Sequence, residues 1–319
     1  MAATNHNYTA PHLSVPPPRF ALIGAGAYIA PRHLQAIRDV GGDLVAAFDP
    51  KDGGVGILDK HFINAEFFTL FERFDRYINR LRREGNPPNW LTVCSPSHLH
   101  DSHSFFGLRY GMNVICEKPL TVTPWNLDAL EELEAESTGR IFALMQLRHH
   151  PALLALKQQM DESPRTMHEV ELRYITPRGP WFKLSWKGQE DKSGGVITNI
   201  GIHFLDALMW IFGSEQETTV CIRNEQRTMG YTILDHARVS WFLSTAHTDL
   251  VPGFSGVAER SMRVDGQLVQ FSDGFTDLHT RVYEQALAGQ GVGIAEARPS
   301  IELAWKIRNL PIGSPSTAT

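Results

Sequence analysis

The sequence predicts an α/β protein with two domains: a doubly wound parallel sheet, followed by an α+β domain with a large open, mainly antiparallel sheet. Up to about residue 147, short apolar runs alternate with helical patterns, which is typical of a parallel sheet covered by helices. Further on, runs such as Glu169–Tyr174 alternate polar and apolar residues, as half-exposed antiparallel strands do. A chain of 319 residues is long enough for two complete cores.

The first half is expected to hold buried strands separated by helices. The strands are expected at 20–23, 44–48, 91–94, 113–116 and 142–145. Apolar residues at helical spacing predict helices after Pro31, over 71–81 and after Thr123-Pro124. These segments define a domain over residues 19–147, preceded by a flexible arm over 1–18 that ends in three prolines.

The second domain is expected over 148–319. Further strands are predicted at 218–222, 237–242, 260–264 and 267–271, and helices near 201–212, 276–288 and 301–307. One face of an open sheet needs cover, so we expect a homo-oligomer, a dimer or tetramer, that assembles through this sheet.

Composition excludes several classes of partner. A formal charge of -5 gives no reason to expect nucleic acid or an anionic membrane. The three cysteines show no CxxC spacing, which favours a reducing compartment. The first 18 residues lack Lys and Arg, which argues against a secretory signal, and no uninterrupted apolar run approaches the roughly 20 residues of a membrane helix. We therefore expect a cytoplasmic protein.

The loop after the first strand carries the start of a dinucleotide-binding (Rossmann) fingerprint. Gly24 and Gly26 let the backbone approach a pyrophosphate at the start of the next helix, where Tyr28 and Ile29 are further candidate contacts. Asp49, at the end of the second strand, is placed to accept hydrogen bonds from a ribose and to repel a 2′-phosphate. The pattern favours NAD over NADP, although an ordinary strand-to-helix turn is the alternative.

Glu117-Lys118-Pro119 directly follows a buried strand. A lysine at the carboxyl end of such a strand is seldom there for packing. Beside an oxidised nicotinamide its pKa would fall, and it can then hydrogen-bond a substrate hydroxyl or take part in moving its proton. We expect Lys118 to be catalytic and, with Glu117, to contact the cofactor.

Histidines cluster after the third strand. His98, His100 and His103 form an H-x-H-x-x-H pattern that would suit zinc, but no carboxylate or thiol at ligand spacing completes the set, so we expect no metal. Ser95 and His100 are kept as cofactor neighbours, while solvent-facing helix-start histidines are the alternative for the other two.

A histidine stands in the helix expected near 201–212. If Asn199 begins this helix, Asn199 and His203 share one face at i, i+4 spacing. Taken alone, His203 reads as a core histidine, but the presence of Lys118 favours a catalytic base. The segment between them also mixes cations with aromatic side chains, which suits a phosphate-bearing nucleotide or sugar, although a solvated loop remains open. The candidate substrate contacts are Tyr174, Arg178, Trp181, Lys187, Lys192 and Asn199.

Taken together, these motifs resemble the Gfo/Idh/MocA family of oxidoreductases. The carrying motifs are Gly24–Gly26, Pro96-x-x-x-His100, Glu117–Pro119 and Gly201-x-His203-x-x-Asp206. The resemblance covers nearly the whole chain after residue 18. It implies an NAD-binding domain, a second domain with an open antiparallel sheet, and hydride transfer between a sugar or polyol carbon and the nicotinamide.

Several segments are also similar to the UDP-N-acetylglucosaminuronate 3-dehydrogenases within that family. They span 23–33, 178–181, 185–188, 192–195 and 277–280. This likeness implies oxidation of the sugar 3′-hydroxyl on the route to diacetamido uronic acids of bacterial surface polysaccharide. In some members 2-oxoglutarate re-oxidises bound NAD. It also implies that Lys118 stabilises the reacting oxygen, His203 takes its proton and Asn199 orients the sugar.

The chain departs from the family at two positions. Asn199 replaces an aspartate that pairs with the histidine in many members, and Ser97 replaces an asparagine. An amide does not raise the pKa of His203 as a carboxylate would, so Lys118 or His203 remains open as the proton acceptor. A dehydrogenase of a free sugar or inositol, and a non-catalytic NAD-binding regulator, are the alternatives.

Overall fold

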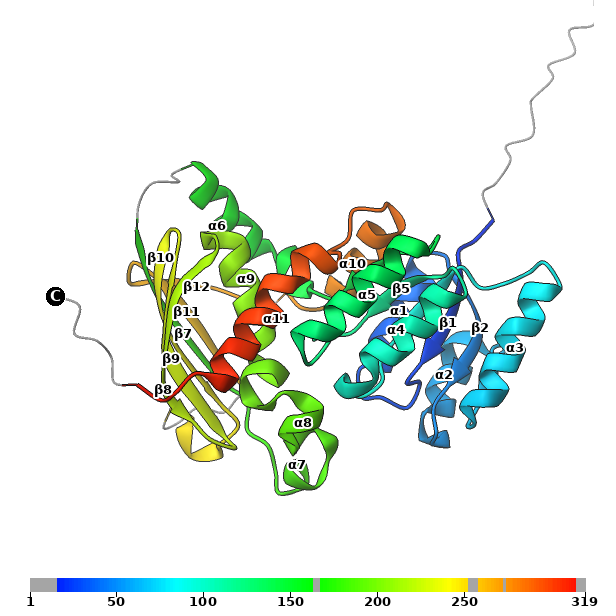
Figure 1. Cartoon of the computed structure of the whole chain (residues 1–319), viewed down its shortest axis with the longest axis horizontal. Coiled ribbons are helices and arrows are strands. Elements are labelled where there is room, and N and C mark those ends of the chain that lie inside the picture. The colour runs from blue at the N-terminus through cyan, green and yellow to red at the C-terminus, as the bar shows by residue number, and fades with distance from the viewer. Residues whose placement is uncertain (1–15, 163–166, 252–257, 272–273, 314–319) are drawn as a thin grey trace, which may run out of the picture.

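The computed structural model describes residues 16–162, 167–251, 258–271 and 274–313. Most of the predicted N-terminal arm lies outside these residues. Two six-stranded sheets, each packed against helices, confirm the predicted α/β class (Figure 1).

The first sheet is fully parallel, in the order β3-β2-β1-β4-β5-β6. The strands are β1 (Arg19–Ile23), β2 (Asp43–Phe48), β3 (Glu66–Phe68), β4 (Trp90–Val93), β5 (Asn113–Cys116) and β6 (Ile141–Ala143). The order reverses between β1 and β4, and ligands of such sheets bind in the crevice at the carboxyl ends of the strands there. The edge strand β3 was not predicted, because it is short and only partly buried.

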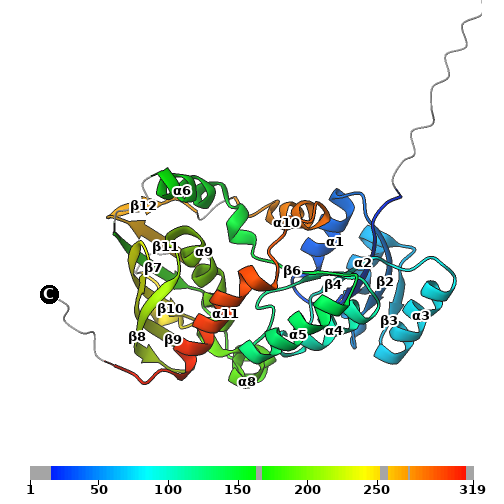
Figure 2. The same ribbon diagram turned by 45° about the horizontal axis from the view of Figure 1, so that its top comes forward.

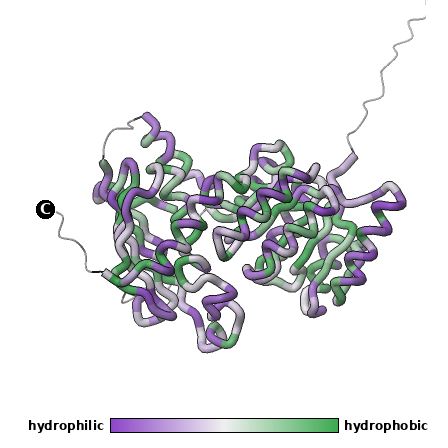
Figure 3. Tube along the Cα trace, in the orientation of Figure 1, coloured by the Kyte–Doolittle hydropathy of each residue, from purple (hydrophilic) through white to green (hydrophobic). Residues whose placement is uncertain are grey.

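Helices cover both faces of this sheet. They are α1 (Ala30–Asp39), α2 (Val55–Phe62), α3 (Phe71–Arg83), α4 (His100–Arg109) and α5 (Pro124–Glu136). In α1, Pro31 lies in the first turn, Leu34 and Ile37 are buried, and Gly41 follows the helix with a φ of 69°. Figure 3 shows the apolar segments gathered in the strands, whereas the outlying helix α3 is largely hydrophilic.

One helix from late in the chain returns to the first sheet. Helix α10 (Leu278–Leu287) packs against α1, as Figure 2 shows. Its Tyr283 is fully buried in the same core cluster as Phe20 and Trp90. Residues about 250 positions apart therefore meet behind the carboxyl ends of the strands.

The second sheet follows η3 (Gln146–His149) and α6 (Pro151–Glu162), in the order β12-β11-β7-β10-β9-β8. Its strands are β7 (His168–Ile175), β8 (Glu215–Arg223), β9 (Arg227–Leu234), β10 (Ala237–Ser244), β11 (Glu259–Val264) and β12 (Gln267–Val269). It is mainly antiparallel, as predicted, except that β7 and β10 pair in parallel. Strand β9 was not predicted because Gly230 interrupts its pattern. A Cβ there would lie 2.5 Å from the Trp241 ring, so the glycine makes room for it.

Helices α9 (Ile202–Phe212) and α11 (Ile294–Asn309) cover one face of the second sheet, and no helix of the described residues covers the other (Figure 1). The helical stretch Glu190–Phe212 is long and apolar enough, by length and composition, to cross a membrane. However, 72% of its apolar window is buried inside the protein, where it forms core. Helix α9 carries His203 toward the first domain.

Candidate active site

The glycine loop forms a tight cradle between β1, β2 and β4. Gly24 has a φ of 94°, and a Cβ there would lie 2.6 Å from the Cys94 backbone. The Gly26 N–H donates to Asp49 Oδ2 at 2.9 Å, while Asp49 Oδ1 accepts from the Lys51 N–H at 2.9 Å. The loop leads into the N-terminus of α1, whose free N–H groups suit a pyrophosphate, so these residues fit NAD. Of the other predicted contacts, Tyr28 is 90% exposed and Ile29 precedes α1.

His100 braces two of the loops at this edge. Its Nε2 lies 2.8 Å from the Ser95 carbonyl, and its Nδ1 lies 2.6 Å from the Pro119 carbonyl. Burial lowers the pKa of His100, although these two hydrogen bonds raise it. The ring therefore ties the end of β4 to the turn that carries Lys118.

The other two histidines of the H-x-H-x-x-H pattern have separate environments. His103 Nδ1 pairs with Ser95 Oγ at 2.8 Å, and burial lowers the pKa of His103 to about 4. His98 packs near the Trp186 ring, with a centroid distance of 6.4 Å. His103 is thus bonded within the fold while it stays partly exposed. In the described part of the chain, the pattern does not form a group of residues close enough to share a metal ion.

Lys118 links the two domains. Its Nζ donates to the Asn199 carbonyl at 2.8 Å. Asn199 lies in a π-helical turn, η5 (Ile197–Gly201), just before α9, and such turns occur often at functional sites. Burial lowers the pKa of Lys118 to about 8. Glu117 opposes this shift, and the positive charges of Lys187 and Arg178 add to it. Lys118 can therefore change its protonation near neutral pH.

His203 lies at the start of α9. Its Nδ1 is buried and has no hydrogen-bond partner among the described residues. Burial, reinforced by the charge of Lys118, holds the pKa of His203 well below its usual range, so the ring is neutral and free to accept a proton. The Asn199 amide donates to the Lys187 carbonyl at 3.3 Å. The π turn replaces the α-helical i, i+4 geometry expected for Asn199 and His203, and no described hydrogen bond joins them.

The cationic segment contributes unequally to this region. It contains α7 (Trp181–Leu184), η4 (Trp186–Gly188) and α8 (Glu190–Ser193). Arg178 and Lys187 lie near enough to Lys118 to lower its pKa, and burial together with Arg178 lowers the pKa of Lys187. Burial lowers the pKa of His98, and the positive charge of nearby Lys192 lowers it further.

The two predicted aromatic contacts have other neighbours. Trp181 is 52% exposed and packs edge-on against Phe182, with 5.8 Å between ring centroids. Tyr174 packs against Phe204, and the Arg260 guanidinium lies 5.6 Å from its ring centroid. The structure thus gathers Lys118, Arg178, Lys187, Asn199 and His203, whereas no described contact joins Trp181 or Tyr174 to them.

A network of buried polar side chains lies behind Glu117, and it was not predicted from the sequence. Glu117 Oε1 lies 3.0 Å from His33 Nε2 and 3.6 Å from His279 Nε2. On its other side, His33 Nδ1 lies 2.8 Å from the Tyr283 hydroxyl. His33 and His279 belong to segments that carry the family resemblance, but their chain separation gives no sign that they meet.

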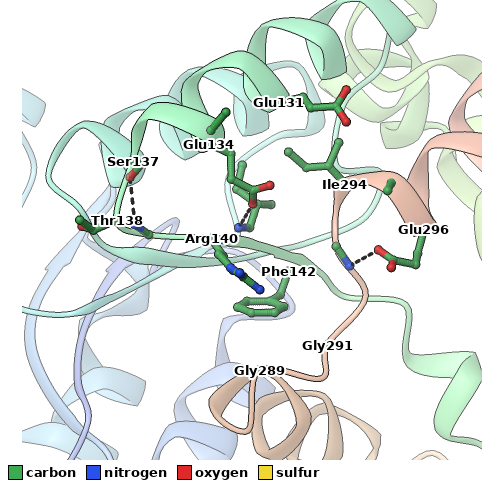
Figure 4. A pocket seen from close by; sticks show the side chains of 15 residues that line it. Glu131, Glu134, Ser137, Thr138, Arg140, Phe142, Gly289, Gly291, Ile294 and Glu296 are labelled. Carbon is green, nitrogen blue, oxygen red and sulfur yellow. Dashed lines mark hydrogen bonds between the residues drawn. The ribbon is translucent and has the colours of Figure 1, made fainter.

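A separate cavity of about 640 Å³ lies at the amino end of β6 (Figure 4). Glu131, Glu134 and Arg140 line one side of it, and the glycine-rich segment 289–293 lines the other. Lys118 follows the carboxyl end of the neighbouring parallel strand β5, so this cavity lies at the opposite edge of the sheet. It is therefore not the candidate active site.

A glycine cradle with an acidic partner, a lysine with a pKa of about 8 and a neutral, partly buried histidine define a nicotinamide-dependent oxidoreductase. The chain belongs to the Gfo/Idh/MocA family. The family's NAD-binding Rossmann-fold domain matches residues 18–144, and its C-terminal alpha/beta domain matches residues 166–246. These matches confirm the predicted family, fold and cofactor.

Two proteins of known character illustrate the relationship. The WlbA (WbpB) dehydrogenase of Thermus thermophilus, solved in complex with NAD and alpha-ketoglutarate, is 45% identical, with a TM-score of 0.90 over 94% of this chain and 97% of that one. The same enzyme was solved with NAD and UDP-GlcNAcA. The D-glucoside 3-dehydrogenase of Escherichia coli K12 is 29% identical over 62% of this chain and 54% of that protein. The chain spans about half the length of the curated relatives it matches.

Proposed function

We propose that this protein oxidises the 3′-hydroxyl of UDP-N-acetylglucosaminuronate to a ketone, with NAD as the hydride acceptor. The carrying observation is the position of Lys118 Nζ, held 2.8 Å from the Asn199 carbonyl and close to the charges of Arg178 and Lys187. The 45% identical Thermus thermophilus enzyme, solved with NAD and UDP-GlcNAcA, supports this substrate.

The residues divide the chemistry between them. The glycine loop and Asp49 would hold NAD, which supplies the acceptor for the hydride that leaves C3 of the sugar. At neutral pH Lys118 is mostly protonated and donates a hydrogen bond to the 3′-oxygen, which stabilises its developing negative charge. His203 is neutral and accepts the hydroxyl proton.

The cations around Lys118 suit an anionic substrate. Arg178 and Lys187 offer charge to the uronate carboxylate or the diphosphate, and Asn199 orients the sugar. A free inositol has no negative charge to offset these cations, so the site favours the sugar nucleotide. Trp181, Lys192 and Tyr174 stay as outer contacts of the nucleotide.

Asp49 favours NAD over NADP. Its two oxygens already accept N–H bonds from Gly26 and Lys51, which fixes the carboxylate beside the glycine loop. A 2′-phosphate at the adenosine ribose would meet this negative charge.

Re-oxidation by 2-oxoglutarate is part of the proposal, supported by the relative solved with alpha-ketoglutarate. The product would be a 3-keto sugar nucleotide for transamination, in the cytoplasm, toward a diacetamido uronic acid of surface polysaccharide. We also propose that the open sheet mediates a homodimer or homotetramer, since its outward side chains include Tyr231 and Leu268, which are 42% and 44% exposed. Light scattering of the protein with and without charged substitutions at these two residues tests this assembly.

The activity is tested with purified protein, NAD and UDP-N-acetylglucosaminuronate, by absorbance at the reduced-nicotinamide band. The same assay with myo-inositol and with free N-acetylglucosaminuronate tests substrate class. We expect turnover of the UDP-sugar only, and its loss in Lys118→Met but not in the exposed-lysine variant Lys183→Met. Turnover of inositol with no turnover of the UDP-sugar would reject the proposed substrate.

A further inference from the structure

A chain of buried polar side chains ends at the residue that precedes Lys118. Thr92, His33, Glu117, His279 and Tyr283 are all at least nine-tenths buried. They come from β4, α1, the turn after β5 and α10, so four separate segments meet here. The proposed chemistry assigns no role to Thr92, His33, His279 or Tyr283. Polar side chains are seldom buried together in this number.

The hydrogen bonds of this chain have one consistent direction. Burial lowers the pKa of His33, so its ring is neutral and donates from only one nitrogen. With Nε2–H donating to the Glu117 carboxylate at 3.0 Å, Nδ1 must accept from the Tyr283 hydroxyl at 2.8 Å. The Tyr283 oxygen then accepts from Thr92 Oγ1 at 2.8 Å. Every donor in this series of hydrogen bonds thus points toward Glu117.

His279 places a second imidazole beside the same carboxylate, just beyond hydrogen-bond distance. Its Nε2 lies 3.6 Å from Glu117 Oε1, and its ring meets His33 edge-on with 5.1 Å between centroids. The nearby His279 ring and the hydrogen bond from His33 hold the pKa of Glu117 well below its usual range despite burial. Glu117 is therefore a fixed buried anion, and its Oε2 also accepts from the Lys118 backbone N–H at 3.2 Å.

Among the residues that the structure describes, this anion is the charge that favours the Lys118 ammonium. From other elements, Lys118 faces the Asn199 carbonyl, neutral His203, the His100 ring, and the cations Lys187 and Arg178. Burial and both cations disfavour its charged form, while the charge of Glu117 and the bond to the Asn199 carbonyl support it.

We propose that His33, His279 and Tyr283 are positioning residues that keep the Glu117 carboxylate charged and in place, so that Glu117 sets the protonation and the position of Lys118. The inference rests on the proposed function in one respect: the action of Lys118 on the sugar. The control of Lys118 by the network is a property of the NAD-bound protein without substrate.

The test measures the protonation of Lys118 directly, without turnover. The NAD-bound full-length protein is labelled with trace acetic anhydride from pH 6 to 10.5, and acetylation of the Lys118 peptide is quantified by mass spectrometry, with exposed Lys183 as the internal standard. Without NAD the pKa of Lys118 is about 8, and the positive nicotinamide moves the wild-type inflexion to that value or below it. In Glu117→Gln it falls by about 1, because an opposite charge nearby is removed.

Variants of His279 separate positioning from packing. His279→Leu removes the polar ring beside the carboxylate and lowers the inflexion, whereas His279→Gln places an amide N–H near the Nε2 position and restores it. Thr232→Val is the control, because it breaks the buried bond from Trp241 Nε1 to Thr232 Oγ1, 3.0 Å long, in the other sheet. It leaves the inflexion unchanged. If Glu117→Gln fails to fold, the two His279 variants still decide the matter.

An unchanged inflexion in Glu117→Gln and His279→Leu would overturn the proposal, as would an equal shift in Thr232→Val. Elemental analysis is done first, since the ligand atoms of His33, Glu117 and His279 all lie within 4.8 Å of one another. A stoichiometric metal lost in His279→Leu would also overturn it, because the metal would replace the hydrogen bonds. Shifted labelling with no UDP-sugar turnover would leave this inference standing and reject the proposed function.

Discussion

Replacing Lys118 with Met is expected to stabilise the protein without NAD or substrate while it abolishes oxidation. The pKa of Lys118 falls from the ordinary 10.5 to about 8 in the folded protein, chiefly through burial. At about 1.36 kcal/mol per pKa unit, holding the ammonium there costs folding about 3.4 kcal/mol at most. Lys118 is partly exposed, and the variant loses the hydrogen bond to Asn199, so we expect a net gain of about 1–2 kcal/mol.

The gain has a defined pH dependence. Below the folded pKa of about 8 the lysine is charged in both states, so the full penalty is present. As pH rises from 8 toward 10.5 the folded protein releases its proton first, and wild type gains stability relative to the variant. Above 10.5 both states are neutral and the penalty is gone.

Differential scanning calorimetry at pH 7, 8, 9 and 9.5 measures this difference. With an unfolding entropy of about 2.1 cal/mol/K per residue, 1–2 kcal/mol corresponds to a melting temperature about 1.5–3 °C higher in the variant at pH 7. Lys183→Met, which removes an exposed lysine paired with Glu225, is the matched control and stays within about 1 °C of wild type. A less stable Lys118→Met at pH 7, or a difference that does not shrink with pH, would refute the reasoning.

Three further predictions concern the fold, the cofactor and the substrate. Asp206 is 2% exposed and accepts hydrogen bonds of 2.9 and 2.7 Å from Arg148. Asp206→Ala is therefore expected to lower the free energy of unfolding by about 3–5 kcal/mol, measured with denaturant. The control Asp128→Ala, at an exposed residue, changes this free energy by less than about 1 kcal/mol. Asp49→Ala raises the KM for NAD about tenfold in steady-state kinetics and admits NADP, and unchanged discrimination would contradict its role. Lys187→Ala raises the KM for the UDP-sugar about tenfold while kcat changes little; an equal effect of Lys183→Ala would show that general charge, and no specific contact, is responsible.

Local patterns were sufficient to predict the parts of the fold that depend on neighbouring residues. The run at Asn113–Cys116 became strand β5, and the Gly24 and Asp49 positions followed from the ends of two strands. Local patterns did not predict elements whose formation depends on tertiary packing. Gly230 weakens the pattern of β9 but makes room for Trp241, and Pro299 inside α11 hid that helix's first turns.

The candidate site shows the same division. Lys118 and His203 were predicted from motifs and from the chemistry that each must supply. The π turn that aims the Asn199 carbonyl at Lys118 was not, because an i, i+4 pattern assumes α-helical geometry. The pairing of His33 with Tyr283 joins residues 250 positions apart, and no local pattern encodes it.

Isotope transfer tests whether the hydride leaves C3 of the sugar. UDP-N-acetylglucosaminuronate carrying deuterium at C3 is incubated with the protein and NAD, and the nicotinamide is analysed by mass spectrometry. We expect one deuterium in the reduced nicotinamide with wild type and none with Lys118→Met. Reduced nicotinamide without deuterium, or none at all although the sugar binds, would contradict oxidation at this carbon.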